Sequence, residues 1–323
     1  MALLEIRDLS VEFVTRRGAV RALDGVSLDI EAGEIVGMVG ESGAGKSLTG
    51  AAVIGLLEPP GRIAGGRIRL DGRDLVGLDE AAMRRIRGRR IGAIFQDPLT
   101  ALNPLLTVGD QLVETIVTHL PVTHDAARKR AIGLLDETGI PSATRRIDHY
   151  PHQFSGGMRQ RVVIALALAA DPQVIIADEP TTALDVSVQA QILDLLRRLC
   201  RDHRAAVLLI THDLGVVAET ADRVAVMYAG RIVEAGPVAD IMARPRHPYT
   251  AGLMQAIPTV GDLRPRLMQI GGAMPRPGAH PRGCAFGPRC PAMRADCADA
   301  VPPLLPLGTS QVACRHPARP EAA

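Results

Sequence analysis

The stretch GESGAGKS at residues 40–47 combines three glycines with a lysine and two serines. Glycines let the backbone curl so that its N–H groups converge on phosphate oxygens, and a following helix N-terminus also favours an anion. Lys46 would bring positive charge to the β- and γ-phosphates, and the Ser47 hydroxyl would bind Mg²⁺. The stretch therefore predicts a nucleotide phosphate site, with an ordinary glycine-rich turn as the alternative. Its members are Gly40, Glu41, Ser42, Gly43, Ala44, Gly45, Lys46 and Ser47.

Two adjacent carboxylates end the apolar stretch VIIADEP at residues 174–180. Asp178, at the end of the expected strand, would hold the Mg²⁺. Glu179 would face the γ-phosphate, where a carboxylate can accept a proton from the attacking water. Taken alone, the pair could be a solvated acidic turn. Beside the glycine-rich loop, it predicts nucleotide hydrolysis.

Apolar runs indicate the elements that position these residues. Residues 26–30 alternate like a half-buried strand, whereas the nearly continuous runs at 34–39, 91–95, 174–177 and 206–210 are typical of strands at the centre of a sheet. A helix is expected at 48–57. The apolar residues of 187–203 also follow helical spacing, and Cys200 on that helix would lie in or beside the core. Residues 97–170 show helical patterns without a comparable strand. The fold class is therefore α/β with a helical insertion at about 97–170.

Composition bounds the class of protein. The chain has 323 residues, of which 47% are hydrophobic and 22% charged, as in globular proteins. The longest apolar run, residues 162–170, is far shorter than the roughly 20 residues of a membrane span, and charges stand where a signal peptide would be apolar. The chain is expected in the cytosol. Near balance of 37 basic and 35 acidic residues, with 2% aromatics, favours no nucleic-acid partner.

The stretch FSGGMRQR at residues 154–161 precedes an expected helix at 158–169. Ser155 offers a hydroxyl there, while Gly156 and Gly157 expose backbone N–H groups that suit a second phosphate. This stretch resembles the signature of ATP-binding cassette (ABC) ATPases, in the variant of importers of di- and oligopeptides and of nickel. Further motifs stand in the family's order: Gln96 in FQDP, Asp185 in TTALD and His212 in THD.

The resemblance implies a P-loop NTPase cassette with a mixed sheet core, a helical subdomain and bound ATP with Mg²⁺. Two cassettes would meet head to tail, so that ATP on the loop 40–47 of one is closed by Ser155 and Gly157 of the other. Gln96 would contact the Mg²⁺ and the water, Asp185 would lie at the dimer seam, and His212 would hold the γ-phosphate. The ordinary alternatives are a loop amide, a helix-capping acid and a structural histidine.

One position departs from the family pattern. Many cassettes stack adenine on an aromatic ring just before a glycine that resembles Gly18, but Arg17 stands here. The guanidinium of Arg17 or the ring of Phe13 could stack on the base instead.

Two further stretches, DPLTALNPLLTVGDQL at 97–112 and HPYTAGLMQAIP at 247–258, resemble peptide importer ATPases. The resemblance implies an ATPase that powers import of short peptides, with nickel, glutathione or opines as alternative cargo. A non-transport ABC ATPase is disfavoured, because the chain has one cassette and no heptad run. Implied partners are a second ATPase chain, expected to form a heterodimer, two permease subunits that dock near Gln96, and an extracytoplasmic binding protein. The chain would lie peripherally on the cytoplasmic face of the inner membrane.

After residue 236 the sequence is rich in proline and glycine, which predicts a cassette domain at 1–236 and a small loop-rich domain at 237–323. This second region holds Cys284, Cys290, Cys297 and Cys314. A reducing cytosol disfavours disulfides, so a metal site is expected. The region resembles the C-terminal part of peptide importer ATPases, some of which carry a four-iron cluster. A [4Fe-4S] cluster, Zn²⁺ and free structural thiols stay open, with His280 and His316 as substitute ligands.

Overall fold

The computed structural model describes residues 2–16, 18–182, 184–257 and 268–318. The chain divides into two compact units. The first unit contains residues 1–4, 30–35 and 69–210, and the second contains residues 5–29, 36–68 and 211–323. Both units combine strands with helices, which confirms the predicted α/β class.

A parallel sheet forms the centre of the first unit. Strand β7 (Val174–Asp178) pairs with β6 (Ile91–Ile94) on one side and with β8 (Ala206–Ile210) on the other. These strands were predicted from their apolar runs, and β8 is buried at every position. The expectation that all of them are central is wrong for β6, which ends the strand order. This edge strand is nevertheless largely buried, because helix α7 packs against it.

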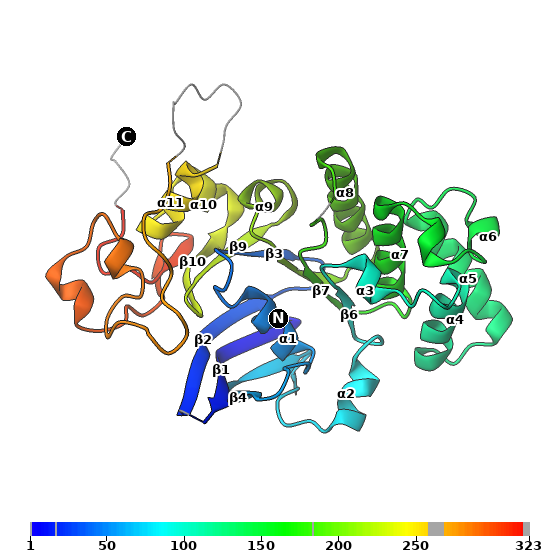
Figure 1. The fold of residues 1–323 in the computed structure, drawn as a ribbon, viewed down its shortest axis with the longest axis horizontal. Coiled ribbons are helices and arrows are strands. Elements are labelled where there is room, and N and C mark those ends of the chain that lie inside the picture. The colour runs from blue at the N-terminus through cyan, green and yellow to red at the C-terminus, as the bar shows by residue number, and fades with distance from the viewer. Residues whose placement is uncertain (1, 17, 183, 258–267, 319–323) are drawn as a thin grey trace. The chain divides into compact units, whose positions relative to one another are not determined.

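Helices fill the segment between β6 and β7, as predicted (Figure 1). Side-chain caps begin the main ones, since Thr107, Thr123 and Ser155 accept a bond from the first turn of α4, α5 and α7. The segment comprises α3 (Pro98–Ala101), α4 (Val108–His119), α5 (His124–Glu137), α6 (Ala143–Arg146), the 3₁₀ helix η1 (Pro151–Gln153) and α7 (Gly156–Leu168). Helices α2 (Glu80–Ile86) and α8 (Val186–His203) complete the unit. Cys200 is buried on α8, in agreement with the prediction.

A mixed sheet runs through the second unit, in the strand order β11-β12-β10-β9-β3. Strand β3 (Ile35–Val39) pairs in parallel with β9 (Arg223–Tyr228), and β9 pairs antiparallel with β10 (Arg231–Pro237). Helices α1 (Lys46–Val53), α9 (Leu214–Thr220), α10 (Val238–Ala243) and α11 (Pro248–Gln255) belong to this unit. Helix α1 starts two residues earlier and ends four residues earlier than the predicted 48–57, with Gly45 at its N-cap.

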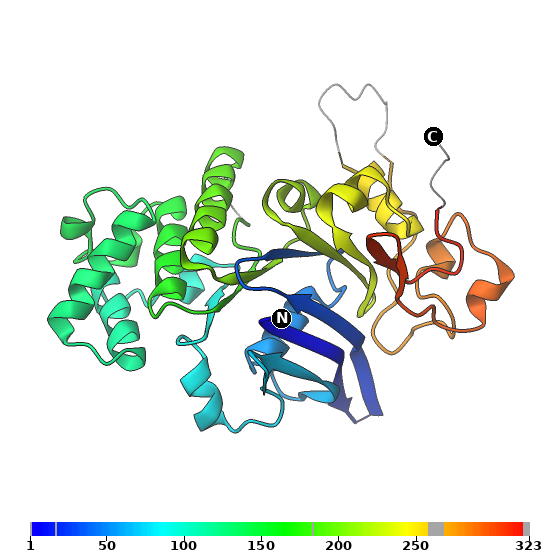
Figure 2. The same cartoon turned by 180° about the vertical axis from the view of Figure 1, so that it is seen from behind.

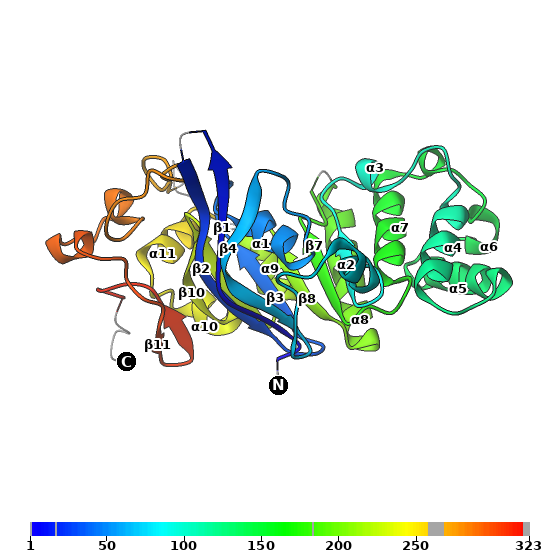
Figure 3. The same ribbon diagram turned by 90° about the horizontal axis from the view of Figure 1, so that it is seen from below.

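A second sheet of this unit has the strand order β2-β1-β4, seen in Figure 3. It contains β1 (Leu4–Thr15), β2 (Gly18–Ile30) and β4 (Gly61–Leu70). The predicted alternation at 26–30 falls in β2, where Val26, Leu28 and Ile30 are buried. Strand β5 (Arg73–Asp74) pairs with the end of β4.

The chain after residue 237 is mostly loop, as predicted (Figure 2). Strand pairing and a shared core nevertheless tie it to the sheet. Strand β12 (Ser310–Val312) pairs with β10 and with β11 (Leu305–Leu307), while η2 (Gly287–Arg289) and η3 (Ala295–Ala298) are 3₁₀ helices. Tyr228, Tyr249 and Phe286 share one core cluster. Both sides of residue 236 lie in the same unit, so the domain boundary stays a prediction. None of the described helices combines the length and the apolar character needed to span a bilayer.

Candidate active site

The glycine-rich loop at residues 40–47 lies between β3 and α1, as the sequence predicts. Gly40 has φ 154° and Gly45 has φ 107°, a region that side chains disfavour. A β-carbon at Gly40 would lie 2.3 Å from the carbonyl oxygen of Met227, and one at Gly45 would lie 2.5 Å from Leu23 Cδ2. These positions therefore require glycine for the path of the loop.

Lys46 points back into this loop. Its side chain is buried, and Nζ donates to the carbonyl oxygens of Gly40 at 2.7 Å and Glu41 at 3.1 Å. The next residue, Ser47, is exposed in the first turn of α1. A charged ammonium group, the N-terminus of α1 and an accessible hydroxyl are together suited to a phosphate with its Mg²⁺.

The second predicted element stands at the end of β7. Glu179 follows Asp178 and has φ 47°, a strained conformation for a residue with a side chain, and its N–H donates to the Ile210 carbonyl at 2.8 Å. Its Oε2 accepts from Gln96 Nε2 at 3.0 Å and from Thr182 Oγ1 at 2.8 Å. The structure thus brings Gln96 and Glu179 together, and two donors orient the carboxylate.

Two predicted residues act as helix caps. Ser155 is exposed and accepts from Met158 N at the start of α7, beside the exposed Gly156 and the half-buried Gly157. Asp185 is exposed and accepts from Val188 N at 2.9 Å at the start of α8. This hydrogen bond is the main cause that lowers the pKa of Asp185. The ordinary reading of Asp185 as a helix-capping acid holds, and its role at a dimer seam stays a prediction.

His212 lies in the turn between β8 and α9, and it is exposed. Its neighbours order the turn: Asp213 caps α9, and Thr211 N donates to the carbonyl of Met38 in β3 at 3.1 Å. Thr211, the residue before His212, is thus hydrogen-bonded to β3, the strand that precedes the glycine-rich loop.

The predicted residues are divided between the units. The second unit carries the loop 40–47 and His212, and the first carries Gln96, Ser155, Gly156, Gly157, Asp178, Glu179 and Asp185. Arg17 lies outside the described residues. The alternative adenine contact, Phe13, lies on β1 with its ring beside Gly61. Adenine recognition therefore stays a prediction.

Sequence reasoning missed three residues that touch this machinery. Thr182 holds Glu179, and Tyr249 and Arg289 both bind Glu41 in the glycine-rich loop. Thr182 belongs to the quoted TTALD motif and Tyr249 to HPYTAGLMQAIP, but both stretches served only to indicate a family. Arg289 stands immediately before Cys290, in a segment whose only predicted site residues are the cysteines.

The four predicted cysteines line one small pocket of the second unit. Cys284, Cys290, Cys297 and Cys314 are half-buried with free thiols, and Cys284 N donates to the Cys297 carbonyl at 2.8 Å. Burial raises the pKa of Cys314 to about 11, and it also raises the pKa of Cys284 and Cys290. These raised pKa values keep the Cys284, Cys290 and Cys314 thiols protonated at neutral pH.

Three histidines of the second unit line two different pockets, and the cysteines line one of these pockets. His316 and His247 line the same pocket as the cysteines, whereas His280 lines a different pocket with Asp24 and Arg231, and its role as a substitute ligand stays a prediction. One ligand atom each from Asp296, Cys297 and His316 lie within 4.8 Å of one another. His316 Nε2 is bonded to Asp296 at 2.8 Å. His247 is 1% exposed, and its Nε2 has no hydrogen-bond partner among the described residues.

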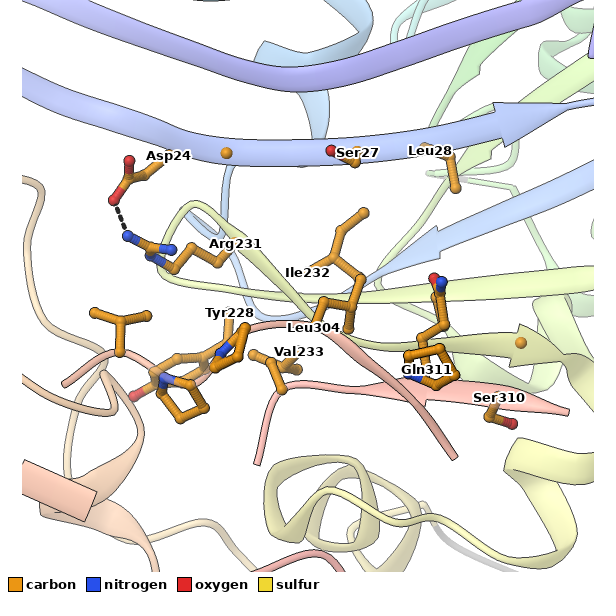
Figure 4. Close-up of a pocket in the computed structure, with 18 of the residues that line it drawn as sticks. Asp24, Ser27, Leu28, Tyr228, Arg231, Ile232, Val233, Leu304, Ser310 and Gln311 are labelled. Carbon is orange, nitrogen blue, oxygen red and sulfur yellow. Dashed lines mark hydrogen bonds and ion pairs between the residues drawn. The ribbon is translucent and has the colours of Figure 1, made fainter. Parts of the chain in front are cut away.

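A larger cavity of about 770 Å³ lies in the second unit, between β2, β10 and the C-terminal strands (Figure 4). Two of its arginines have acidic partners, since Arg231 pairs with Asp24 and Arg7 with Asp29. Among the described residues, none of the predicted ATP-binding side chains lines it. This cavity is therefore distinct from the loop 40–47.

Family models match two parts of the chain. Residues 23–182 match the ABC transporter model, and residues 233–297 match the C-terminal region of oligopeptide/dipeptide transporters. The dipeptide transport ATP-binding protein DppD of Haemophilus influenzae is 45% identical over 98% of this chain and 96% of its own length. The oligopeptide transport ATP-binding protein OppD of Bacillus subtilis is 50% identical over 94% of this chain and 85% of its own length.

Solved ABC cassettes share the fold. A dimeric post-hydrolysis state of an ATP-binding cassette bound to ADP and phosphate matches with a TM-score of 0.65 at 30% identity, over 73% of this chain and 98% of that chain. The protein cbiO1 of Clostridium perfringens matches with a TM-score of 0.65 at 29% identity, over 75% of this chain and 91% of its own. These matches confirm the predicted cassette fold.

Proposed function

The chain belongs to the ABC transporter family, and we propose that it is the ATP-hydrolysing subunit that powers import of short peptides through a membrane permease. The observation that carries this proposal is similarity over nearly the whole chain to dipeptide and oligopeptide transport ATP-binding proteins. The match of the C-terminal region to peptide transporters supports the same cargo.

The residues take the following parts in hydrolysis. The loop N–H groups and Lys46 would bind the phosphates. Ser47, Asp178 and Gln96 would hold Mg²⁺, which would supply positive charge to the phosphate oxygens. Glu179 accepts the proton of the attacking water, and Gln96 and Thr182 hold its carboxylate in place. His212 contacts the γ-phosphate.

A second cassette completes each ATP site in this proposal. Ser155 and Gly156 are exposed at the start of α7, where a partner's nucleotide can reach them, and Asp185 is exposed at the start of α8. We propose that two such surfaces meet head to tail, and that a related chain is the partner. ATPase activity should then rise more than linearly with protein concentration, and it should be very low for the monomer.

The permease docks near Gln96, on the cytoplasmic face of the inner membrane. Phe95 precedes Gln96 and is 46% exposed, and Leu99 and Leu105, which follow Gln96 along the chain, are 60% and 83% exposed. Large apolar side chains exposed to water in the segment that contains Gln96 suit a protein partner. Leu105→Ser should weaken assembly with the permease while ATP binding stays intact.

Reconstitution tests the transport function. The chain, its partner ATPase and two permease subunits are placed in vesicles with a binding protein, and uptake of labelled dipeptides is measured with and without ATP. Uptake that requires ATP and stops with Glu179→Gln supports the proposal. ATP-driven uptake of nickel, glutathione or an opine instead would refute the assignment of peptides as the cargo, while the assignment as a transport ATPase would stand.

The four cysteines suit a metal centre, and we propose a [4Fe-4S] cluster there, with Zn²⁺ as the alternative. Four thiols line one pocket without disulfides, and the buried Nε2 of His247, which belongs to the same pocket, has no hydrogen-bond partner among the residues that the structure describes. A bound cluster would lower the pKa of the ligating thiols and cross-link the four segments that carry them.

Metal analysis after anaerobic purification tests the centre. Iron and sulfide at about four per chain would support the cluster, stoichiometric zinc would replace it, and the absence of both would refute a metal site. Cys290→Ser should lose the metal and lower the melting temperature. Cys200→Ala, which alters a buried thiol outside the pocket, is the matched control and should keep the metal.

A further inference from the structure

Glu41, the second residue of the glycine-rich loop, is held at its three polar groups. Its N–H donates to Tyr249 Oη at 2.9 Å, its carbonyl accepts from Lys46 Nζ at 3.1 Å, and its carboxylate accepts from Arg289 Nη1 at 2.9 Å. Only Lys46 belongs to the loop, since Tyr249 and Arg289 lie 208 and 248 positions further along the chain. Residues of the C-terminal region thus hold a residue of the phosphate-binding loop.

Arg289 is well placed to fix the Glu41 carboxylate. Its side chain is 6% exposed, so its positive charge is largely removed from water and needs a partner. Nη1 also donates to Tyr228 Oη at 3.3 Å, while Nε and Nη2 donate to the carbonyls of Gly271 at 2.9 Å and Ile270 at 3.2 Å. The guanidinium lies over the Tyr228 ring, 5.7 Å from its centroid. These contacts leave the side chain little freedom to follow a moving loop.

Tyr249 is equally constrained. It is the second residue of α11 and is completely buried, with its ring 4.7 Å from Tyr228 and 5.4 Å from Phe286 between centroids. Packing on two rings fixes the direction of its hydroxyl, whose oxygen accepts the Glu41 N–H. Tyr249 therefore holds the loop backbone itself.

We propose that Arg289 and Tyr249 are positioning residues of the nucleotide site, which keep the loop 40–47 in its phosphate-binding shape. A loop that is already ordered loses less conformational entropy when ATP binds, so these contacts raise the affinity for ATP. The proposal rests on the assignment of residues 40–47 as the phosphate loop. It also makes ATP affinity depend on the packing of the cysteine segment, because Arg289 immediately precedes Cys290.

Equilibrium binding of a fluorescent ATP analogue to the purified full chain, well below its melting temperature, tests the proposal. Arg289→Gln should weaken binding by about tenfold and Tyr249→Phe by about threefold, which correspond to ~1.4 and ~0.6 kcal/mol. Glu41→Gln in the Arg289→Gln background should add little, because the two side chains act through one contact. Arg289→Lys should recover part of the affinity, since lysine restores the charge without the planar fork.

The matched control is Arg7→Gln. It removes an arginine from a carboxylate of the same unit, Asp29, on strands β1 and β2 outside the loop, and binding should stay within about twofold of the parent. If Arg289→Gln does not fold, Tyr249→Phe and Arg289→Lys decide the question by the same measurement.

The opposite result is that the Arg289 and Tyr249 variants bind with an affinity within about twofold of the parent and have a lowered melting temperature. This result would show that the contacts stabilise the fold without affecting ATP binding, and it would overturn the proposal. Lys46→Ala separates this failure from that of the proposed function. If Lys46→Ala also binds ATP like the parent, residues 40–47 are not the phosphate site. If it alone loses affinity, only the role of Arg289 and Tyr249 falls.

Discussion

Glu179→Gln should stop hydrolysis and leave the fold and ATP binding intact. Gln96 Nε2 and Thr182 Oγ1 both donate to the same carboxylate oxygen, at 3.0 Å and 2.8 Å. A glutamine that places its amide oxygen there keeps both hydrogen bonds, so the free energy of unfolding should change by less than about 0.5 kcal/mol. The amide has no negative charge and cannot take a proton from water.

The expected loss follows from the role of a general base. Such groups contribute about 10²–10⁴-fold, so the barrier should rise by ~3–5 kcal/mol. The assay is single-turnover ATP hydrolysis in the assembled transporter, with ATP affinity measured on the same sample. The variant should also accumulate the ATP-bound closed dimer, detected by size-exclusion chromatography.

Glu179→Ala is the informative comparison, because it removes the acceptor for Gln96 and Thr182 as well as the base. It should hydrolyse as slowly as Glu179→Gln and be less stable by about 1–2 kcal/mol, from two lost hydrogen bonds. Hydrolysis by Glu179→Gln within about threefold of the parent would refute the assignment of Glu179 as the base.

Three further predictions concern packing and charge. Gly157→Ala would place a β-carbon 2.6 Å from Val188 Cγ1, so the free energy of unfolding in urea should fall by about 1–3 kcal/mol. A second substitution, Val188→Ala, should restore most of that stability. An unchanged stability of the single variant would contradict this packing. Phe286→Ala should destabilise the chain by about 3–5 kcal/mol, because Phe286 is 2% exposed among Tyr228 and Tyr249, and thermal unfolding measures the loss. Burial raises the pKa of Glu234 above its ordinary value of 4.5. At a pH between 4.5 and the raised pKa, native Glu234 keeps its proton while the unfolded chain loses it, so the free energy of unfolding falls as the pH rises through this range. Glu234→Gln should flatten this slope in unfolding titrations over a pH series, and parallel slopes would argue against it.

Much of the fold could be predicted because the strands of the cassette are buried on both faces. Residues 174–177 and 206–210 are short, continuous apolar runs. Such runs are typical of strands that are buried on both faces of a sheet. The insertion at 97–170 was predictable because its apolar residues follow helical patterns and no strand-like apolar run comparable to the others interrupts them. The edge position of β6 was not predictable, since an apolar run reports burial and not the neighbours of a strand.

The sequence by itself determined which residues are predicted to bind and hydrolyse ATP, because a glycine-rich loop with a lysine, and two carboxylates after an apolar strand, form short motifs that can be identified without the fold. Only the tertiary structure decided how that chemistry is held. Gln96 and Thr182 meet one oxygen of Glu179, and Tyr249 and Arg289 reach Glu41 from more than 200 residues away. Contacts between distant segments leave no periodicity or spacing in the sequence, because they arise where separate elements pack. The same packing gathers four cysteines in one pocket and leaves His280 in another.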